Sequence, residues 1–125
     1  MKVQNNKEKM VGNEKQQVEI TPELIQEWKK QHGKIYKSTI DGEEFYWRRL
    51  KRKEYVTVMS DEALEEEQSE TRSRIYHRQE EIVKIAVLYP VDIEKHIADS
   101  AGLATSLADE IILRSGFDIP KTEEL

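Results

Sequence analysis

The stretch that decides the fold runs from Lys34 to Leu50 and reads KIYKSTIDGEEFYWRRL. Its centre, Asp41-Gly42, is a typical two-residue hairpin turn, because such turns require residues that tolerate positive φ angles. Residues with high strand propensity flank the turn on both sides. We therefore predict an antiparallel β-hairpin with three cross-strand pairs: Ile40 with Glu43, Ser38 with Phe45, and Tyr36 with Trp47.

The two faces of this hairpin differ in polarity. Away from the turn, one face is largely apolar, and it carries Tyr36, Ser38, Ile40, Glu43, Phe45 and Trp47. The other face is mostly polar, and it carries Ile35, Lys37, Thr39, Glu44, Tyr46 and Arg48. A lone hairpin is only marginally stable in water, so its aromatic face should pack on helices.

A helix should precede the hairpin. Thr21-Pro22-Glu23 supplies an N-cap residue, a proline at the first helical position and an acid in the first turn. We expect this helix to run to about His32, with Gly33 as the left-handed residue that follows it. Its apolar stripe should pack on the aromatic face of the hairpin, and it consists of Leu24, Ile25 and Trp28.

Helices should also follow the hairpin. The pattern predicts a short helix over Lys51–Met59 and a longer one from Asp61 to about Leu88, ended by Pro90. In the longer helix, residues 65–74 are wholly polar. The apolar residues that follow recur with helical period and should be buried: Ile75, Tyr76, Ile82, Val83 and Ala86.

Two further helices are expected after Pro90. Asp92 can cap a short helix that Gly102 breaks, and Thr105 or Ser106 then begins the last helix. Gly116 is well placed as its C′ residue. A Schellman ending there would bring Phe117 against Ile112.

The chain should form one domain with a loose segment at each side. Residues 1–18 are polar without a period, which is typical of a disordered tail. Residues 118–125 read as a flexible acidic tail. The single domain therefore spans residues 19–117, in keeping with a chain of 125 residues.

Composition excludes several classes of function. The formal net charge of −5 argues against general affinity for nucleic acid and for anionic membranes. The absence of cysteine excludes disulfides and thiolate zinc sites. The start of the chain lacks the apolar stretch of a signal peptide, and no run approaches the roughly 20 apolar residues of a membrane span. We expect a soluble chain that is not exported.

No catalytic or metal-binding pattern stands out. His32, His77 and His96 lack metal-ligand spacing, and we expect them at the surface or the edge of the core. The runs Glu65-Glu66-Glu67 and Glu80-Glu81 point in directions about 100° apart along a helix, so they do not converge on one ion. No serine lies in a nucleophile motif. We therefore expect no enzymatic activity, no cofactor and no metal.

The most unusual local feature is the basic cluster, Arg48-Arg49-Leu50-Lys51-Arg52-Lys53. Positive charge at a helix N-terminus opposes the helix dipole, so this cluster is unfavourable unless something acidic faces it. Three explanations are open: the acidic stretch Asp61 to Glu70 folds over it, an acidic protein partner binds it, or nucleic-acid phosphates contact it while Tyr46 and Trp47 stack on bases. The residues that we expect to contact a partner are Arg48, Arg49, Lys51, Arg52, Lys53, Glu66 and Arg72.

Several short phrases follow one another from Thr21 to Phe117. They are TPEL at 21–24, WKK at 28–30, GKIY at 33–36, IDGEEF at 40–45, RL at 49–50, RKEY at 52–55, EIV at 81–83, VLYP at 87–90, AGL at 101–103, LA at 107–108 and SGF at 115–117. This string resembles small proteins of tailed bacteriophages, namely tail assembly chaperones and minor tail or baseplate proteins. The phrases cover turns, caps and core positions, so no functional residue is carried over. The resemblance implies a loop-like link over residues 92–100, unlike the helix expected above.

The resemblance implies a non-enzymatic role in building a phage tail, in which a chaperone coats the tape-measure protein until tube subunits replace it. We expect an α+β fold in which an N-terminal helix and β-hairpin pack against a small set of C-terminal helices. The expected function is chaperone-like protein binding in the host cytoplasm, with tape-measure, tube or baseplate subunits as partners. A resident structural protein of the tail or baseplate is the alternative, and a nucleic-acid-binding regulator is a more distant one. An oligomer is left open.

Overall fold

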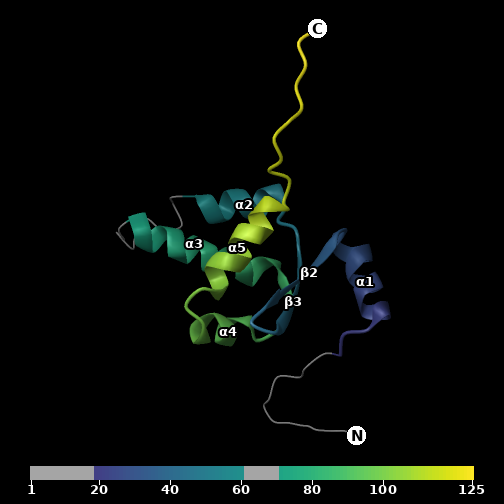
Figure 1. Ribbon diagram of the computed structural model, residues 1–125, viewed down its shortest axis with the longest axis vertical. Coiled ribbons are helices and arrows are strands. Elements are labelled where there is room, and N and C mark those ends of the chain that lie inside the picture. Colours follow the sequence, from purple (N-terminus) through teal and green to yellow (C-terminus); the bar gives the residue numbers. More distant parts are fainter. Residues whose placement is uncertain (1–18, 61–70) are drawn as a thin grey trace, which may run out of the picture.

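The computed structural model describes residues 19–60 and 71–125, with the side chains of 71–73 excepted. Within these ranges five helices and a three-stranded antiparallel sheet make an α+β fold, as predicted. The elements in chain order are α1 (Pro22–His32), β2 (Ile35–Ile40), β3 (Glu43–Arg48), α2 (Arg52–Met59), α3 (Thr71–Ala86), β4 (Val87–Tyr89), α4 (Ile93–Asp99) and α5 (Leu103–Leu113). Helices α2, α3, α4 and α5 gather on one side, whereas α1 lies at the far end of the hairpin (Figure 1).

The predicted hairpin is confirmed, including its register. All three expected pairs are present, and the turn residues Asp41 and Gly42 have φ angles of 55° and 79°. Positive φ at both positions matches the twist of the flanking strands. The rings of Tyr36 and Trp47 stack with centroids 4.6 Å apart.

A third strand was not predicted. The helix expected to reach Leu88 ends at Ala86, and β4 (Val87–Tyr89) pairs antiparallel with β3. Two causes favour the strand over a longer helix. The residue before Pro90 is sterically pushed toward extended backbone, and the free edge of β3 needs backbone partners. The sheet order is therefore β2-β3-β4.

The third strand helps to bury part of the hairpin face that we predicted to be mostly polar. Tyr46 is 8% exposed because two rings pack against it. The Tyr89 ring meets it edge-on and the Trp28 ring of α1 is tilted relative to it, each with its centroid 6.0 Å from the Tyr46 centroid. The Trp28 ring of α1 thus contacts this face, opposite the aromatic face that we expected its stripe to cover. The start and end of α1 are as predicted: Thr21 Oγ1 accepts a hydrogen bond from the Leu24 N–H, and Gly33 follows with φ 88°.

The core lies between the aromatic face of the hairpin and helices α3 and α5. Six of its side chains are below 2% exposed: Trp47, Phe45, Ile82, Leu107, Ile111 and Val83. Full burial stabilises each by about 1.5–3 kcal/mol. Ile82, Val83 and Ala86 are buried as predicted, but Ile75 and Tyr76 are 45% and 53% exposed. That prediction was wrong because the first turns of α3 project beyond the rest of the helical layer (Figure 1).

The last two helices depart from the prediction at their ends. Residues 93–99 form a helix, so the loop-like link implied by the resemblance is absent, and Asp92 makes no side-chain capping bond. Helix α5 begins at Leu103, two residues before Thr105, and ends at Leu113 with Arg114 as its C-cap. Gly116, with φ 97°, is therefore one position later than the C′ place expected for it.

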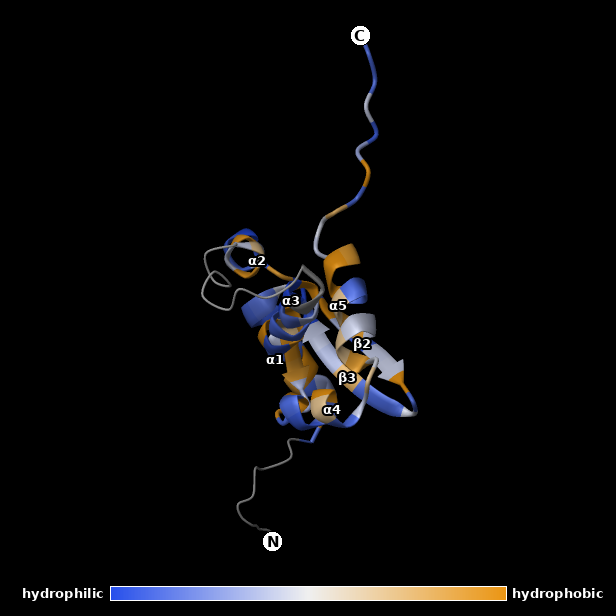
Figure 2. Cartoon of the chain, turned by 90° about the vertical axis from the view of Figure 1, so that its left-hand side faces the viewer, coloured by the Kyte–Doolittle hydropathy of each residue, from blue (hydrophilic) through white to orange (hydrophobic). Residues whose placement is uncertain are grey.

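The chain turns toward α2 after α5. The Ser115 hydroxyl donates to the Ile111 carbonyl at 2.6 Å and accepts from the Leu50 N–H at 3.0 Å. The Phe117 ring then lies 4.8 Å from the Tyr55 ring, and Tyr55, not the expected Ile112, is its aromatic neighbour. Residues 118–125 are exposed, have no helix or strand, and lead away from the domain (Figures 1 and 2).

Other sequence predictions lie outside the described residues. These are the tail over residues 1–18 and the part of the predicted long helix that covers residues 61–70. The short helix expected over 51–59 is present from Arg52 to Met59. Within the described ranges, no helix has the length and apolarity to cross a membrane.

Candidate functional site

The structure divides the predicted partner-binding residues into different roles. Arg48 has an internal role: its Nη1 and Nη2 donate to Glu54 Oε1 and Oε2 at 2.9 and 2.8 Å. Nη2 also donates to the Ile85 carbonyl at 3.2 Å. The Arg48 hydrogen bond holds the pKa of Glu54 below its usual value, although partial burial opposes this shift. We therefore remove Arg48 from the predicted contact surface, since its guanidinium already joins β3 to α2 and to the end of α3.

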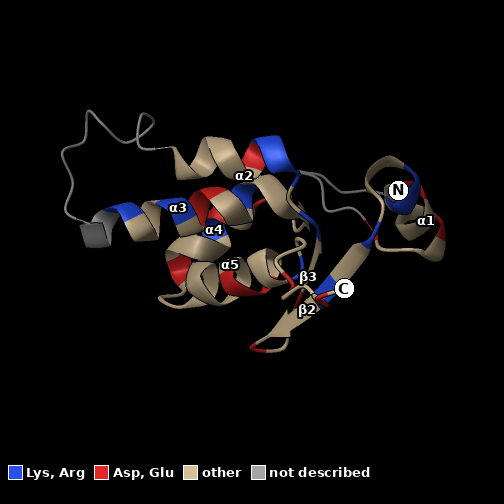
Figure 3. Cartoon of the chain, turned by 90° about the horizontal axis from the view of Figure 1, so that it is seen from above, with Lys and Arg blue, Asp and Glu red and all other residues tan. Residues whose placement is uncertain are grey.

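Three cations of the cluster lie at the N-terminus of α2. The side chains of Lys51, Arg52 and Lys53 are exposed, and none forms an ion pair within residues 19–60 and 71–125. Glu54 accepts a hydrogen bond from the Lys51 N–H at 2.9 Å, which satisfies one free donor of the helix start. The blue ribbon at this end of α2 in Figure 3 marks these Lys and Arg positions. The acidic stretch at 61–70, which one of the three open explanations folds over the cluster, lies outside the described residues.

Arg49 lines a separate feature, which we call the Arg49 hollow. This hollow of about 450 Å³ lies between the start of β2 and the end of α5. Its walls include Lys34, Tyr36, Arg49, Leu113, Arg114 and Asp118. The Arg114 guanidinium lies 5.9 Å from the centre of the Tyr36 ring and also pairs with Glu110 at 3.4 Å. Arg49 has no ion-pair partner in the described part of the chain.

The remaining two predicted residues cannot be placed on this surface. Glu66 lies outside the described residues, and Arg72 lies in α3 but its side chain is not described. The structure therefore brings Lys51, Arg52 and Lys53 together at the start of α2. Arg49 is close to them in the sequence, but its side chain lines the Arg49 hollow instead.

Base stacking by the two hairpin rings is excluded by their burial. Trp47 is 1% exposed, and its indole N–H donates to Ser38 Oγ at 2.9 Å. Tyr46 is 8% exposed, and burial raises the pKa of its hydroxyl, with Glu44 contributing further. Both rings belong to the packed sheet, so the nucleic-acid explanation of the basic cluster loses its stacking platform.

Exposed apolar side chains adjoin the cations. Val56, 47% exposed, lies four residues after Arg52 and three after Lys53, so all three share one side of α2. Phe117, 45% exposed, covers Tyr55 on the same helix. Cations and exposed apolar side chains therefore both lie on α2, and Phe117 adds an exposed ring beside Tyr55.

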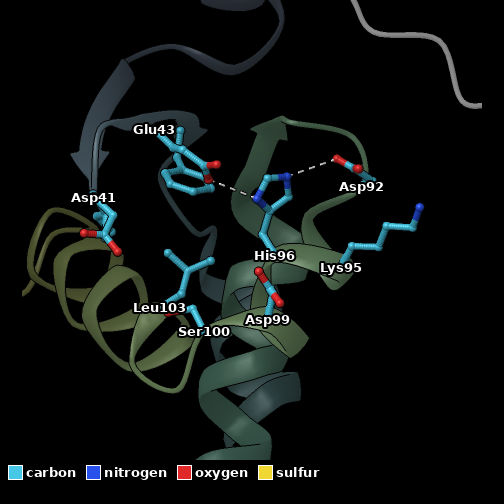
Figure 4. A pocket seen from close by; sticks show the side chains of 10 residues that line it. Asp41, Glu43, Asp92, Lys95, His96, Asp99, Ser100 and Leu103 are labelled. Carbon is cyan, nitrogen blue, oxygen red and sulfur yellow. Dashed lines mark hydrogen bonds and ion pairs between the residues drawn. The ribbon is translucent and has the colours of Figure 1, made fainter.

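A second hollow lies at the opposite end of the hairpin (Figure 4). It measures about 630 Å³, and His96 of α4 lies at its centre. His96 Nδ1 is 3.2 Å from Glu43 Oε1, and Nε2 is 3.4 Å from Asp92 Oδ1. The ring meets Phe45 edge-on at 5.8 Å. Sequence reasoning missed this arrangement because Glu43 and His96 are 53 residues apart.

The His96 arrangement acts as a tether between the hairpin turn and α4. Asp92 Oδ1 is buried and has no hydrogen-bond partner among the described residues, so it can pair with His96 Nε2 only through charge, when the ring is protonated. Among the described residues no group of three or more His, Asp or Glu side chains can hold a metal ion.

Comparisons with known proteins identify no relative of this chain. No family model, no curated protein and no solved structure matches this chain.

Proposed function

We propose that this chain is a non-enzymatic protein-binding factor of bacteriophage tail assembly that acts in a chaperone-like way. The phage context rests on the ordered phrases from Thr21 to Phe117 that resemble small tail proteins. The protein-binding part rests on one observation: exposed Arg52 and Lys53 lie one helical turn before exposed Val56, on the same side of α2.

A surface of this composition favours a protein partner. Protein interfaces combine an apolar centre with a polar rim and are enriched in arginine. The chain as a whole has a net charge of −5, so a local cationic surface would steer an acidic protein region and would serve poorly for the sequence-independent binding of phosphates. The buried hairpin rings also argue against a nucleic-acid regulator.

Charge reversal tests the binding surface. The triple variant K51E/R52E/K53E reverses three exposed cations at the start of α2 without touching the Arg48–Glu54 pair or the Arg49 hollow, so the fold should be kept. We expect it to lose co-purification with tail proteins from infected cells while its circular dichroism spectrum is unchanged. The matched control is K29E/K30E, which reverses two exposed lysines on α1 and should bind normally. Retained binding by the triple variant would overturn the proposed surface.

The place of the protein in assembly is tested by mass spectrometry of purified particles beside infected-cell lysate. Abundance in lysate with absence from particles is the chaperone result. A defined copy number in particles would overturn the chaperone role and favour a resident tail or baseplate protein.

A further inference from the structure

We infer that residues 119–125 of one copy bind in the Arg49 hollow of a second copy, so that the chain associates with itself through this segment. The inference concerns self-association and does not rest on the proposed function. It follows from the composition of the hollow, from the composition of the segment, and from the direction in which the segment leaves its own domain.

The Arg49 hollow is cationic with an apolar wall. Lys34, Arg49 and Arg114 contribute three positive charges, against one negative charge from Asp118 on its rim and one from Glu110, which pairs with Arg114. Leu113 is 54% exposed beside them. Such a site suits an extended segment that carries both carboxylates and aliphatic side chains.

Residues 119–125 have this complementary composition. They contain two acids, Glu123 and Glu124, and one lysine, which gives a formal charge of −1. Ile119 is 93% exposed and Leu125 is fully exposed. Burial of an aliphatic side chain of this size contributes about 1.5–3 kcal/mol, so a second molecule could stabilise the segment substantially.

The segment cannot readily fill the hollow of its own copy. Asp118 already lies on the rim, so the chain would have to reverse within the next two residues. Ile119 precedes Pro120 and is therefore restricted to extended backbone, and Pro120 has a fixed φ. The segment accordingly leads away from the domain, as Figures 1 and 2 show. Seven extended residues span at most about 25 Å, enough to reach a neighbouring copy.

The hollow also borders a sheet edge that can accept a strand. In the described residues β2 pairs only with β3, so its outer edge is open, and Tyr36 of β2 lines the hollow. Extended segments bind such edges through main-chain hydrogen bonds, and a proline is tolerated on an edge strand. Because the segment leaves its domain beside the hollow, a twofold axis would let two copies exchange segments and form a closed dimer.

Sedimentation velocity of the full chain over a range of concentrations tests the inference. We expect a monomer–dimer equilibrium for the full chain and a monomer when residues 119–125 are deleted. The variant E123K/E124K should weaken dimerisation at least tenfold, or by about 1.4 kcal/mol. The control E23K/E27K reverses two exposed acids on α1 and should leave the equilibrium unchanged.

Charge exchange identifies the hollow as the docking site. R49E/R114E should be monomeric, and adding E123K/E124K to the same chain should restore the dimer. A labelled peptide of residues 117–125 should bind the truncated chain but not its R49E/R114E form. Three results would each overturn the inference. They are a monomeric full chain, a dimer that persists after the deletion, and peptide binding that R49E/R114E leaves unchanged.

Discussion

Arg48 and Glu54 form a two-point ion pair that joins strand β3 to helix α2. The two N–O distances are 2.9 and 2.8 Å, and the side chains are 13% and 28% exposed. Arg48 lies in the basic cluster, yet its charge is matched inside the fold. Sequence proximity to Arg49 and Lys51 therefore says nothing about whether its guanidinium is available to a partner.

Removal of this pair should destabilise the domain. Arg48→Ala leaves Glu54 without its charged partner and the Ile85 carbonyl without a donor. We expect a loss of about 2–3 kcal/mol, below the 3–5 kcal/mol of a fully buried pair because Glu54 keeps some contact with water. Urea denaturation followed by circular dichroism measures the loss. Arg52→Ala on the exposed start of α2 is the control, and equal losses for the two variants would contradict the argument.

The same pair should make stability depend on pH in the acidic range. The folded-state pKa of Glu54 is lowered from 4.5, chiefly by the Arg48 hydrogen bond, so its stabilising contribution is complete above the unfolded pKa. The contribution is lost as the pH falls through the lowered folded value. The difference in unfolding free energy between the natural chain and Glu54→Gln should thus be constant near neutrality and shrink below about pH 4.5. A difference that grows on acidification would be the wrong sign and would refute this account.

Ser115 should matter more than an ordinary surface serine. Its hydroxyl links the Ile111 carbonyl at the end of α5 to the Leu50 N–H before α2. Ser115→Ala leaves that N–H without an acceptor and should cost about 1–2 kcal/mol. Ser106→Ala, at an exposed position in α5, is the matched control and should change stability little. Equal urea midpoints for the two variants would show that the link contributes nothing.

Local signals predicted the local structure well. The Asp41-Gly42 turn fixed the hairpin register, and Thr21 with Gly33 fixed α1, because turn and cap preferences act over a few residues. Strand β4 was missed because its three residues extend a helical pattern, and their pairing with β3 is a contact across roughly 40 positions. The His96 hollow and the Ser115 link were missed for the same reason, since their partners come together only through folding.

The site was harder to predict than the fold. The basic cluster is a continuous run in the sequence, but folding divides it among an internal pair, the α2 surface and the Arg49 hollow. A charge count cannot anticipate this division, because it depends on which cation finds a carboxylate such as Glu54 within reach. Burial of Tyr46 likewise depends on Trp28 and Tyr89, which come from distant parts of the chain.

The buried indole of Trp47 offers the sharpest test of the hairpin register. Its N–H donates at 2.9 Å to Ser38 Oγ on strand β2, two residues along from Tyr36, which is the cross-strand partner of Trp47, and the ring is 1% exposed. Ser38→Ala removes the acceptor and leaves a donor that water cannot reach, so we expect a loss of about 1–2 kcal/mol. Thr39→Ala, the exposed neighbour on the same strand, lacks such a bond and is the control. If Ser38→Ala were no more destabilising than Thr39→Ala in urea denaturation, the indole would need another acceptor, and the packing of Trp47 on β2 would have to be revised.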